Sequence, residues 1–212
     1  TTRDAFDPIC VINGEPAAII VRADSRWNTI QDFLAEAKEK PDAVQLANSG
    51  MGNIWHLAAI GIELETGASF NHVPFDGAAS ALTAVLGGHV DAVTCSAAEA
   101  ASNIASGEKV LAVSNTERLE AYPDVPTFQE VGVDLTIVAL RGLCVNKDPP
   151  DNVKKALCDG FEKVINSDAC REKIEAANMT YMPLNAQETN DILDSMSGNF
   201  EKIINAYLNS AN

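Results

Sequence analysis

The residues best suited to chemistry lie in a glycine-rich loop at positions 48–53, which reads Asn-Ser-Gly-Met-Gly-Asn. An apolar stretch precedes the loop, and apolar residues with helical spacing follow it from Ile54 to Leu64. The sequence therefore predicts a strand, a tight turn and a helix. Glycines let backbone N–H groups crowd together, and the start of a helix carries partial positive charge. This arrangement is typical of a site for an anion such as a carboxylate.

A simpler interpretation of the same loop is a structural turn in which Asn53 caps the helix, and the loop alone leaves both interpretations open. The loop is not a dinucleotide fingerprint, because Trp55 stands where the third glycine would be required. It is not a P-loop either, because no Gly-Lys-Ser/Thr follows it.

Composition limits the classes of partner. The 212 residues are enough for one large domain or two small ones, and 30 acidic against 15 basic residues give a net charge of −15. Such a balance argues against nucleic acid and anionic membrane surfaces as partners. No apolar run reaches the roughly 18 residues of a membrane span. The polar first residues carry no signal peptide, so either the protein is cytosolic or a leader has been removed.

The five cysteines have no CxxC spacing, so we expect no zinc site. Cys10, Cys95 and Cys144 lie in apolar, strand-like runs and are predicted to be small core residues. Cys158 and Cys170 fall on two consecutive predicted helices joined by a short turn, so we expect them to be close enough to bridge. A disulfide and two free thiols remain open alternatives there.

Strand and helix patterns alternate over the first half of the chain. The expected strands are 17–21, 44–48, 69–75, 90–94 and 109–114, and the expected helices are 29–40 (capped by Asn28), the run from 54, 78–86 and 96–105. Such alternation with short turns predicts a parallel sheet covered by helices.

The pattern changes after residue 114. Two prolines interrupt residues 122–127, a short helix capped by Thr127 is expected at 128–131, and residues 134–145 suit extended structure. Helices are then expected at 151–166, 168–177 and 186–208. The apolar stripe of the last helix is predicted to consist of Ile192, Met196, Phe200, Ile203, Ile204 and Tyr207.

Several segments, in order, resemble one family: the extracytoplasmic solute-binding proteins of tripartite tricarboxylate transporters, the TctC or Bug family. Residues 47–56 are similar to its Ala-Ser-x-Gly-x-Gly-Ser/Thr-x-x-His loop, and residues 72–77 (His-Val-Pro-Phe-Asp-Gly) to its His-Val-Pro-Tyr-x-Gly. Residues 81–91 and 111–132 resemble its Ala-Leu…Leu-Gly-Gly-x-Val-Asp and Leu-Ala-Val…Pro-Asp-Val-Pro-Thr…Glu-x-Gly motifs. The resemblance extends from about Phe6 to the last helix.

The resemblance implies an α/β, periplasmic-binding-protein-like fold of type II, with parallel-rich sheets flanked by helices and two domains around a cleft. Residues 23–136 would form domain 2, which binds the ligand. Residues 1–22 and 137–212 would form the remainder of domain 1 with the C-terminal helices. Because nothing here matches the family's first strand and loop, we expect the first domain to be incomplete.

The resemblance also implies a site. Ser49, Gly50, Gly52 and Asn53 would offer N–H groups and side chains to one ligand carboxylate. Two further loops follow neighbouring strands, and ligands of parallel sheets bind outside the carboxyl ends of the strands. The expected ligand-binding residues are Ser49, Gly50, Gly52, Asn53, Trp55, Phe75, Asp76, Gly77, Cys95 and Ser96.

The neighbours of these residues have smaller expected roles. His56 is expected either to donate a hydrogen bond that steadies the loop or simply to pack on it. Trp55 lines the cleft or covers the helix start, and Asp91 is expected to anchor a turn. The chain departs from the family pattern at three positions. Asn53 stands where the family has Ser or Thr, Trp55 where it has a small polar residue, and Asp76 where Lys or a neutral residue is common.

The implied function is that of a periplasmic or otherwise extracytoplasmic receptor. It would bind a small organic carboxylate and deliver it to the transmembrane permease subunits, with no catalysis, no cofactor and no metal. A ligand-sensing regulatory domain of the same fold is the alternative. A cysteine-dependent enzyme built on Cys95, His56 and Asp76 is less supported, because no local signature accompanies those residues.

With one wall of the cleft absent, we expect this chain alone to bind carboxylates weakly and to self-associate through the incomplete domain. An exposed helix terminus contributes roughly 0.3–1 kcal/mol, whereas a micromolar complex requires about 8 kcal/mol.

Overall fold

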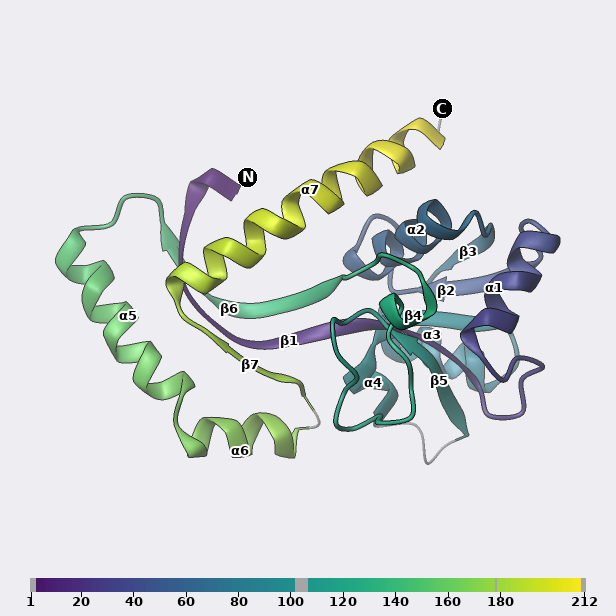
Figure 1. Cartoon of the computed structure of the whole chain (residues 1–212), viewed down its shortest axis with the longest axis horizontal. Coiled ribbons are helices and arrows are strands. Elements are labelled where there is room, and N and C mark those ends of the chain that lie inside the picture. The colour runs from purple at the N-terminus through teal and green to yellow at the C-terminus, as the bar shows by residue number, and fades with distance from the viewer. Residues whose placement is uncertain (1–2, 102–106, 178, 211–212) are drawn as a thin grey trace. The chain divides into compact units, whose positions relative to one another are not determined.

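A computed structural model describes residues 3–101, 107–177 and 179–210 (Figure 1). The strands are β1 (Phe6–Arg22), β2 (Val44–Asn48), β3 (Phe70–Pro74), β4 (Ala92–Ser96), β5 (Glu108–Val113), β6 (Val138–Asn146) and β7 (Tyr181–Leu184). The α-helices are α1 (Ile30–Glu39), α2 (Ile54–Thr66), α3 (Ala78–Leu86), α4 (Ala97–Ala101), α5 (Asp151–Ile165), α6 (Asp168–Ala176) and α7 (Ala186–Ser210), and the short 3-10 turns are η1 (Arg3–Ala5) and η3 (Gln129–Val131). Within these ranges, no helix combines the length and the apolarity needed to cross a bilayer.

The chain forms two compact units. The first contains Thr1–Glu15 and Leu140–Asn199, and the second contains Pro16–Ala139 and Phe200–Asn212. β1, β6 and α7 each contribute residues to both units. The division into domains at 22/23 and 136/137 stays a prediction.

The sheet of the second unit has the strand order β3-β2-β4-β1-β5. β2 pairs in parallel with β3 and β4, whereas β1 pairs antiparallel with β4 and β5. β2, β3, β4 and β5 therefore run in one direction, and their carboxyl ends share one edge. The predicted parallel-rich sheet is confirmed for these four strands, but β1 makes the sheet mixed.

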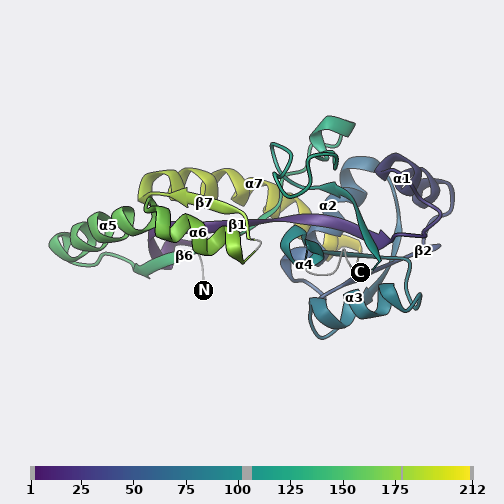
Figure 2. The same cartoon turned by 90° about the horizontal axis from the view of Figure 1, so that it is seen from below.

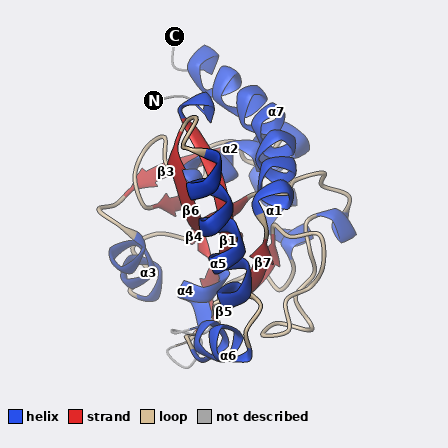
Figure 3. Cartoon of the chain, turned by 90° about the vertical axis from the view of Figure 1, so that its left-hand side faces the viewer, coloured by secondary structure: helices blue, strands red, loops and turns tan. Residues whose placement is uncertain are grey.

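The helices of the second unit cover both faces of this sheet, and β1 shows how. Ile19 belongs to the apolar cluster that includes Phe33 of α1, whereas Ile20 belongs to the cluster that includes Leu82 of α3. Successive residues of a strand face opposite sides, so one strand supplies both cores. Figure 2 shows α1 and α3 on opposite sides of these strands, and Figure 3 distinguishes the strands (red) from the helices (blue).

Helix termini differ from the sequence-based expectations in detail. Thr29, not Asn28, caps α1, because its hydroxyl accepts from the Asp32 amide while the Asp32 carboxylate accepts from the Thr29 amide. Residues 102–106 of the predicted helix 96–105 lie outside the described residues. In α7, Ile203 is buried as predicted, but Ile204 is 41 % exposed, so its place in the apolar stripe was wrong.

In the first unit, β1 pairs with β6 and antiparallel with β7, a strand that was not predicted. Gly142 of β6 admits no side chain, because a Cβ there would lie 2.2 Å from the carbonyl oxygen of Cys10. Cys10 and Cys95 are core residues as expected, whereas Cys144 is exposed, so that prediction was wrong.

Cys158 and Cys170 are both partly buried and free. The structure thus contains two thiols there rather than a disulfide. Their predicted proximity stays a prediction.

Candidate ligand-binding site

Two glycine-containing loops adjoin at the carboxyl edge of the second unit's sheet. β2 ends at Asn48 and β3 ends at Pro74, and these two residues are partners in the parallel register. The Phe75 amide donates to the Asn48 carbonyl at 2.9 Å. A Cβ on Gly50 would lie 4.0 Å from the Phe75 carbonyl oxygen. The loop at Ser49–Asn53 and the loop at 75–77 therefore lie side by side, as the sequence predicted from topology.

The first loop is held by its own hydrogen bonds. Gly50 and Gly52 adopt φ values of 122° and 75°, which side chains rarely tolerate. The Gly50 amide donates to Asn48 Oδ1 at 3.0 Å, and the Asn53 amide donates to the Gly50 carbonyl at 3.4 Å. Asn53 Nδ2 donates to Ser49 Oγ at 2.7 Å. These contacts within the loop stabilise this conformation.

Asn53 is the N-cap of α2, as one of the two interpretations required. Its Oδ1 accepts from the amides of Trp55 and His56, each at 3.0 Å. The amides of Gly50, Gly52 and Asn53 all donate within the protein in this conformation. The loop satisfies these three amides internally in this conformation, and the assignment of these residues as donors to a ligand carboxylate stays a prediction.

His56 accepts a hydrogen bond, whereas the sequence interpretation expected a donor. Its Nδ1 accepts from the Gly52 amide at 3.0 Å, and the side chain is almost completely buried. Its ring centroid lies 4.9 Å from that of His72 and 5.2 Å from that of Tyr207, both edge to face. Burial first, and His72 second, lower the pKa of His56 to about 4, so the imidazole is neutral near pH 7.

Two buried polar side chains near the strand ends were not singled out from the sequence. Asn48 and Thr94 are both 0 % exposed. Asn48 Nδ2 and Thr94 Oγ1 have no hydrogen-bond partner in the part of the chain that the structure describes. Leu46 and Ala47 of β2 pair with Ala92 and Val93 of β4, so Asn48 is next in register to Thr94. The signal in the sequence is a polar residue near the end of an otherwise apolar parallel strand.

The second loop leads into the start of α3. Gly77, at φ 102°, is the N-cap residue of α3 and makes no side-chain capping bond. Asp76 is exposed, and Phe75 is partly buried against the cluster that contains Leu82. The first N–H groups of α3 therefore lack a side-chain cap at the same edge.

Three of the expected ligand residues pack into the protein. Trp55 is 8 % exposed and belongs to the core cluster of α1 and α2. Ser96 is 1 % exposed and caps α4: its amide and Oγ donate to Glu99 Oε2, and its Oγ accepts from the Glu99 amide. Cys95 is fully buried, and its thiol donates to the Ser96 carbonyl. Their assignment as ligand contacts stays a prediction.

The nucleophile arrangement of Cys95, His56 and Asp76 does not form. Cys95 lies in the core cluster of α3 and α4, whereas His56 contacts the loop, His72 and Tyr207. Burial raises the pKa of the Cys95 thiol, which disfavours the reactive thiolate. Within the described residues, no three His, Cys, Asp or Glu side chains are grouped so as to hold a metal ion.

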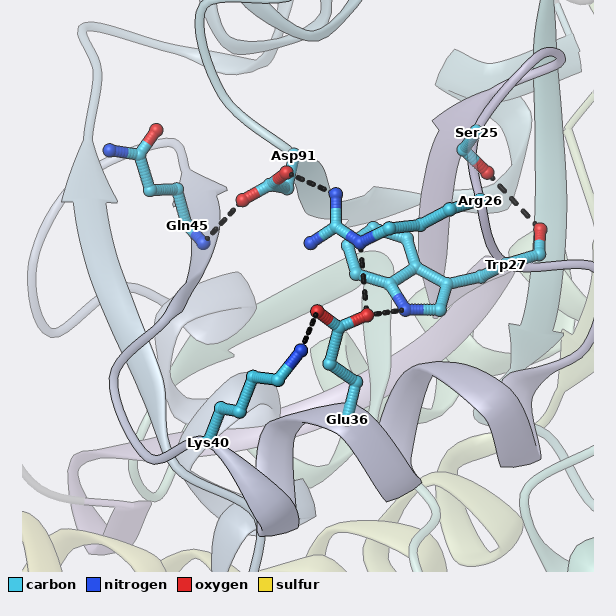
Figure 4. Close-up of polar contacts among 7 residues, drawn as sticks. All are labelled: Ser25, Arg26, Trp27, Glu36, Lys40, Gln45 and Asp91. Carbon is cyan, nitrogen blue, oxygen red and sulfur yellow. Dashed lines mark hydrogen bonds and ion pairs between the residues drawn. The ribbon is translucent and has the colours of Figure 1, made fainter.

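A polar network secures the opposite edge of the sheet (Figure 4). Asp91 accepts from the Gln45 amide at 3.0 Å and from Arg26 Nη1 at 3.0 Å, so it anchors a turn as predicted. Arg26 and the Trp27 indole both donate to Glu36 Oε2, and the guanidinium lies 3.8 Å from the Trp27 ring centroid. Gln45 and Asp91 lie at the amino ends of β2 and β4. This network therefore stabilises the end of the sheet opposite to the glycine loops.

The fold and the loops at one carboxyl edge define the class of periplasmic-binding-protein-like α/β proteins. The family model described as "Tripartite tricarboxylate transporter family receptor" matches residues 1–208, and the chain belongs to this TctC family. A UPF0065 protein from the gbd 5' region of Cupriavidus necator is 27 % identical over 194 residues, which cover 89 % of this chain and 59 % of that protein. A second UPF0065 protein, from Pseudomonas sp. strain P51, is 26 % identical over 98 % of this chain and 62 % of its own length. The chain thus spans about three fifths of these relatives.

Solved structures show the same fold. A TctC solute-binding protein from Polaromonas has a TM-score of 0.87 and 37 % identity, with 97 % of this chain and 71 % of that chain covered. The Rhodopseudomonas palustris proteins Rpa4515, solved with adipate, and MatC, solved with malate, have TM-scores of 0.80 and 0.77. Both align over 94 % of this chain, covering 67 % and 69 % of their own, with 20 % and 19 % identity, and they support the fold alone.

Proposed function

We propose that the chain belongs to an extracytoplasmic receptor that binds a small organic carboxylate and presents it to transmembrane permease subunits. Family membership supports the receptor role. The observation that supports a carboxylate is Nδ2 of the fully buried Asn48 side chain, which has no hydrogen-bond partner among the described residues and lies at the strand ends where the two loops adjoin. A buried donor without an acceptor costs roughly 1–3 kcal/mol. An acceptor oxygen of a bound ligand or ordered water would remove that cost.

The proposed contacts follow from the geometry of this edge. Asn48 Nδ2 and Thr94 Oγ1 would donate from below, and the uncapped start of α3 after Gly77 would donate from the side. Ser49 would line the edge from the first loop, and Asp76 would set the charge of the rim. Gly50, Gly52 and Asn53 would shape the loop. The adipate and malate of the structural neighbours indicate dicarboxylates as the first compounds to test.

Isothermal titration of the chain with malate and adipate, up to millimolar concentration, tests the proposal. Asn48→Asp keeps an acceptor for the Gly50 amide but replaces the unpaired donor with a charge that repels carboxylates. Asn71→Asp on the exposed side of β3 makes the same change away from the loops. We expect binding by wild type and Asn71→Asp and at least tenfold weaker binding by Asn48→Asp. Equal affinities in both variants, or binding of neither compound by wild type, would refute the proposal.

We also propose that copies of the chain associate through the first unit. Its exposed large apolar side chains are Phe6, Leu143, Val153 and Val164, at 37–54 % exposure. Exposed large apolar side chains favour association where they adjoin one another. Light scattering across micromolar concentrations tests this proposal: we expect dimers that Val164→Lys weakens and Leu64→Lys, in the second unit, does not. A monomer at every concentration would contradict it.

A further inference from the structure

His56 holds an exposed loop residue from a buried position. Gly52 is exposed at the tip of the loop, and its amide donates to Nδ1 of His56, which is 1 % exposed. His56 stands in the first turn of α2, whose start is fixed by the Asn53 cap. The loop is therefore attached at Gly52 to the rigid helix that follows it.

This hydrogen bond requires one form of the imidazole. The amide N–H donates, so Nδ1 carries a free lone pair and the proton of the neutral ring is on Nε2. An imidazolium has no lone pair on Nδ1 and cannot accept the bond. The bond therefore exists only while His56 is neutral.

The surroundings keep His56 neutral and its ring fixed. The rings of His72 from β3 and Tyr207 from α7 pack edge to face on it, and Glu63 of α2 lies nearby on its own helix. Glu63 is engaged by His72 Nε2 at 3.2 Å and by the Phe70 amide at 2.7 Å. Any planar ring could make these packing contacts, whereas the hydrogen bond from Gly52 requires Nδ1 of the imidazole.

We propose that His56 is a positioning residue: through Gly52 it sets the conformation of the glycine loop before a ligand arrives. This proposal rests on the proposed function, because its value to the receptor is a lower ordering cost on binding. Without this bond the loop would become ordered only when the ligand binds, and the free-energy cost of that ordering would lower the affinity.

Two substitutions separate the acceptor from the packing. His56→Asn places an amide oxygen near the position of Nδ1, whereas His56→Gln places its amide near Nε2 and offers Gly52 no acceptor. His89→Gln, at an exposed histidine after α3, is the control. The readouts are hydrogen exchange of the Gly52 amide and the affinity for malate, each measured on the 212-residue chain.

We expect wild type, His56→Asn and His89→Gln to protect the Gly52 amide alike. In His56→Gln, exchange of the Gly52 amide should be at least tenfold faster, and the affinity for malate should be about three- to tenfold lower. Gly52 exchange that is equal in His56→Asn and His56→Gln would overturn the proposal. Absence of malate binding to wild type refutes the proposed function instead, and the exchange result still decides the role of His56. Should His56→Gln fail to fold, a trans-hydrogen-bond N–N coupling between Gly52 and His56 Nδ1 in wild type supports the proposal, and its absence overturns it.

Discussion

The Gly52 amide and Nδ1 of His56 form a 3.0 Å hydrogen bond that ties the exposed tip of the candidate ligand loop to the buried start of α2. The fold lowers the pKa of His56 from 6.5 to about 4, chiefly by burial. Between these values the unfolded chain binds more protons at this site than the folded chain does. His56 therefore contributes stability that is fully present above about pH 6.5 and is lost as the pH falls through about 4.

We predict from this that His56→Asn removes part of the acid sensitivity of the fold. The difference in unfolding free energy between pH 7 and pH 4.5 should be smaller in the variant, by at most about 3 kcal/mol. Urea unfolding of both proteins at the two pH values measures it. An identical pH dependence in variant and wild type would contradict the prediction.

Glu108 should have the opposite effect. Its side chain is buried, neither carboxylate oxygen has a hydrogen-bond partner among the described residues, and burial raises its pKa from 4.5 to about 7. The folded chain then binds more protons than the unfolded one between those values, so stability falls as the pH rises through this range. We predict that Glu108→Gln is more stable than wild type at pH 8, by at most about 3 kcal/mol, and similar to it at pH 4. Thermal unfolding at both pH values tests this, and a variant that is less stable at pH 8 would show that the charged form is accommodated.

Asp76 gives the rim of the site a negative charge. It is exposed beside Gly77, where a carboxylate ligand is proposed to bind. We predict that Asp76→Asn strengthens malate binding about two- to fivefold at low salt, in line with the modest value of exposed charge pairs. Glu39→Gln at the end of α1 changes the net charge equally and should leave affinity unchanged. Equal gains in both variants would assign the effect to the overall charge of −15 rather than to Asp76.

Asp91 should matter for stability rather than for binding. Its carboxylate accepts from the Gln45 amide and from Arg26, and both donors lose a partner in Asp91→Ala. We predict a loss of roughly 1–3 kcal/mol in unfolding free energy. Asp124→Ala, at an exposed aspartate, should stay within about 0.5 kcal/mol of wild type in the same urea titration. Equal losses of unfolding free energy in the two variants would show that the Asp91 network does not stabilise the fold.

The sequence predicted the order of strands and helices well, because glycines, prolines and caps mark their ends. It indicated a strand-like run around Cys10 and a strand at 17–21 but did not join them into one strand, since Asn13, Glu15 and Pro16 interrupt the apolar pattern between them. In the structure Asn13 Nδ2 donates to Glu15 Oε1 at 2.9 Å, and Arg141 Nη1 lies 3.5 Å from the same oxygen, so partners near in the chain and far along it stabilise these polar side chains. Such a pairing has no signature in residue spacing.

The site was predicted less completely than the fold. The glycine loop, the Asn53 cap and the shared strand edge followed from the sequence, but the burial of Ser96 did not. Strands buried on both faces lack an apolar-polar alternation, so the sequence does not tell which side chain faces which core. For the same reason Asn48 and Thr94 were not singled out.

We propose that a carboxylate binds at the carboxyl edge of the second unit. The most direct measurement of this binding is the map of backbone amide shifts while the chain is titrated with malate to millimolar concentration. The account predicts that the largest shifts cluster at Ser49–Asn53 and at residues 75–79, with the Arg26 and Asp91 amides unchanged. Shifts concentrated at the Arg26 and Asp91 edge, or none anywhere, would contradict it.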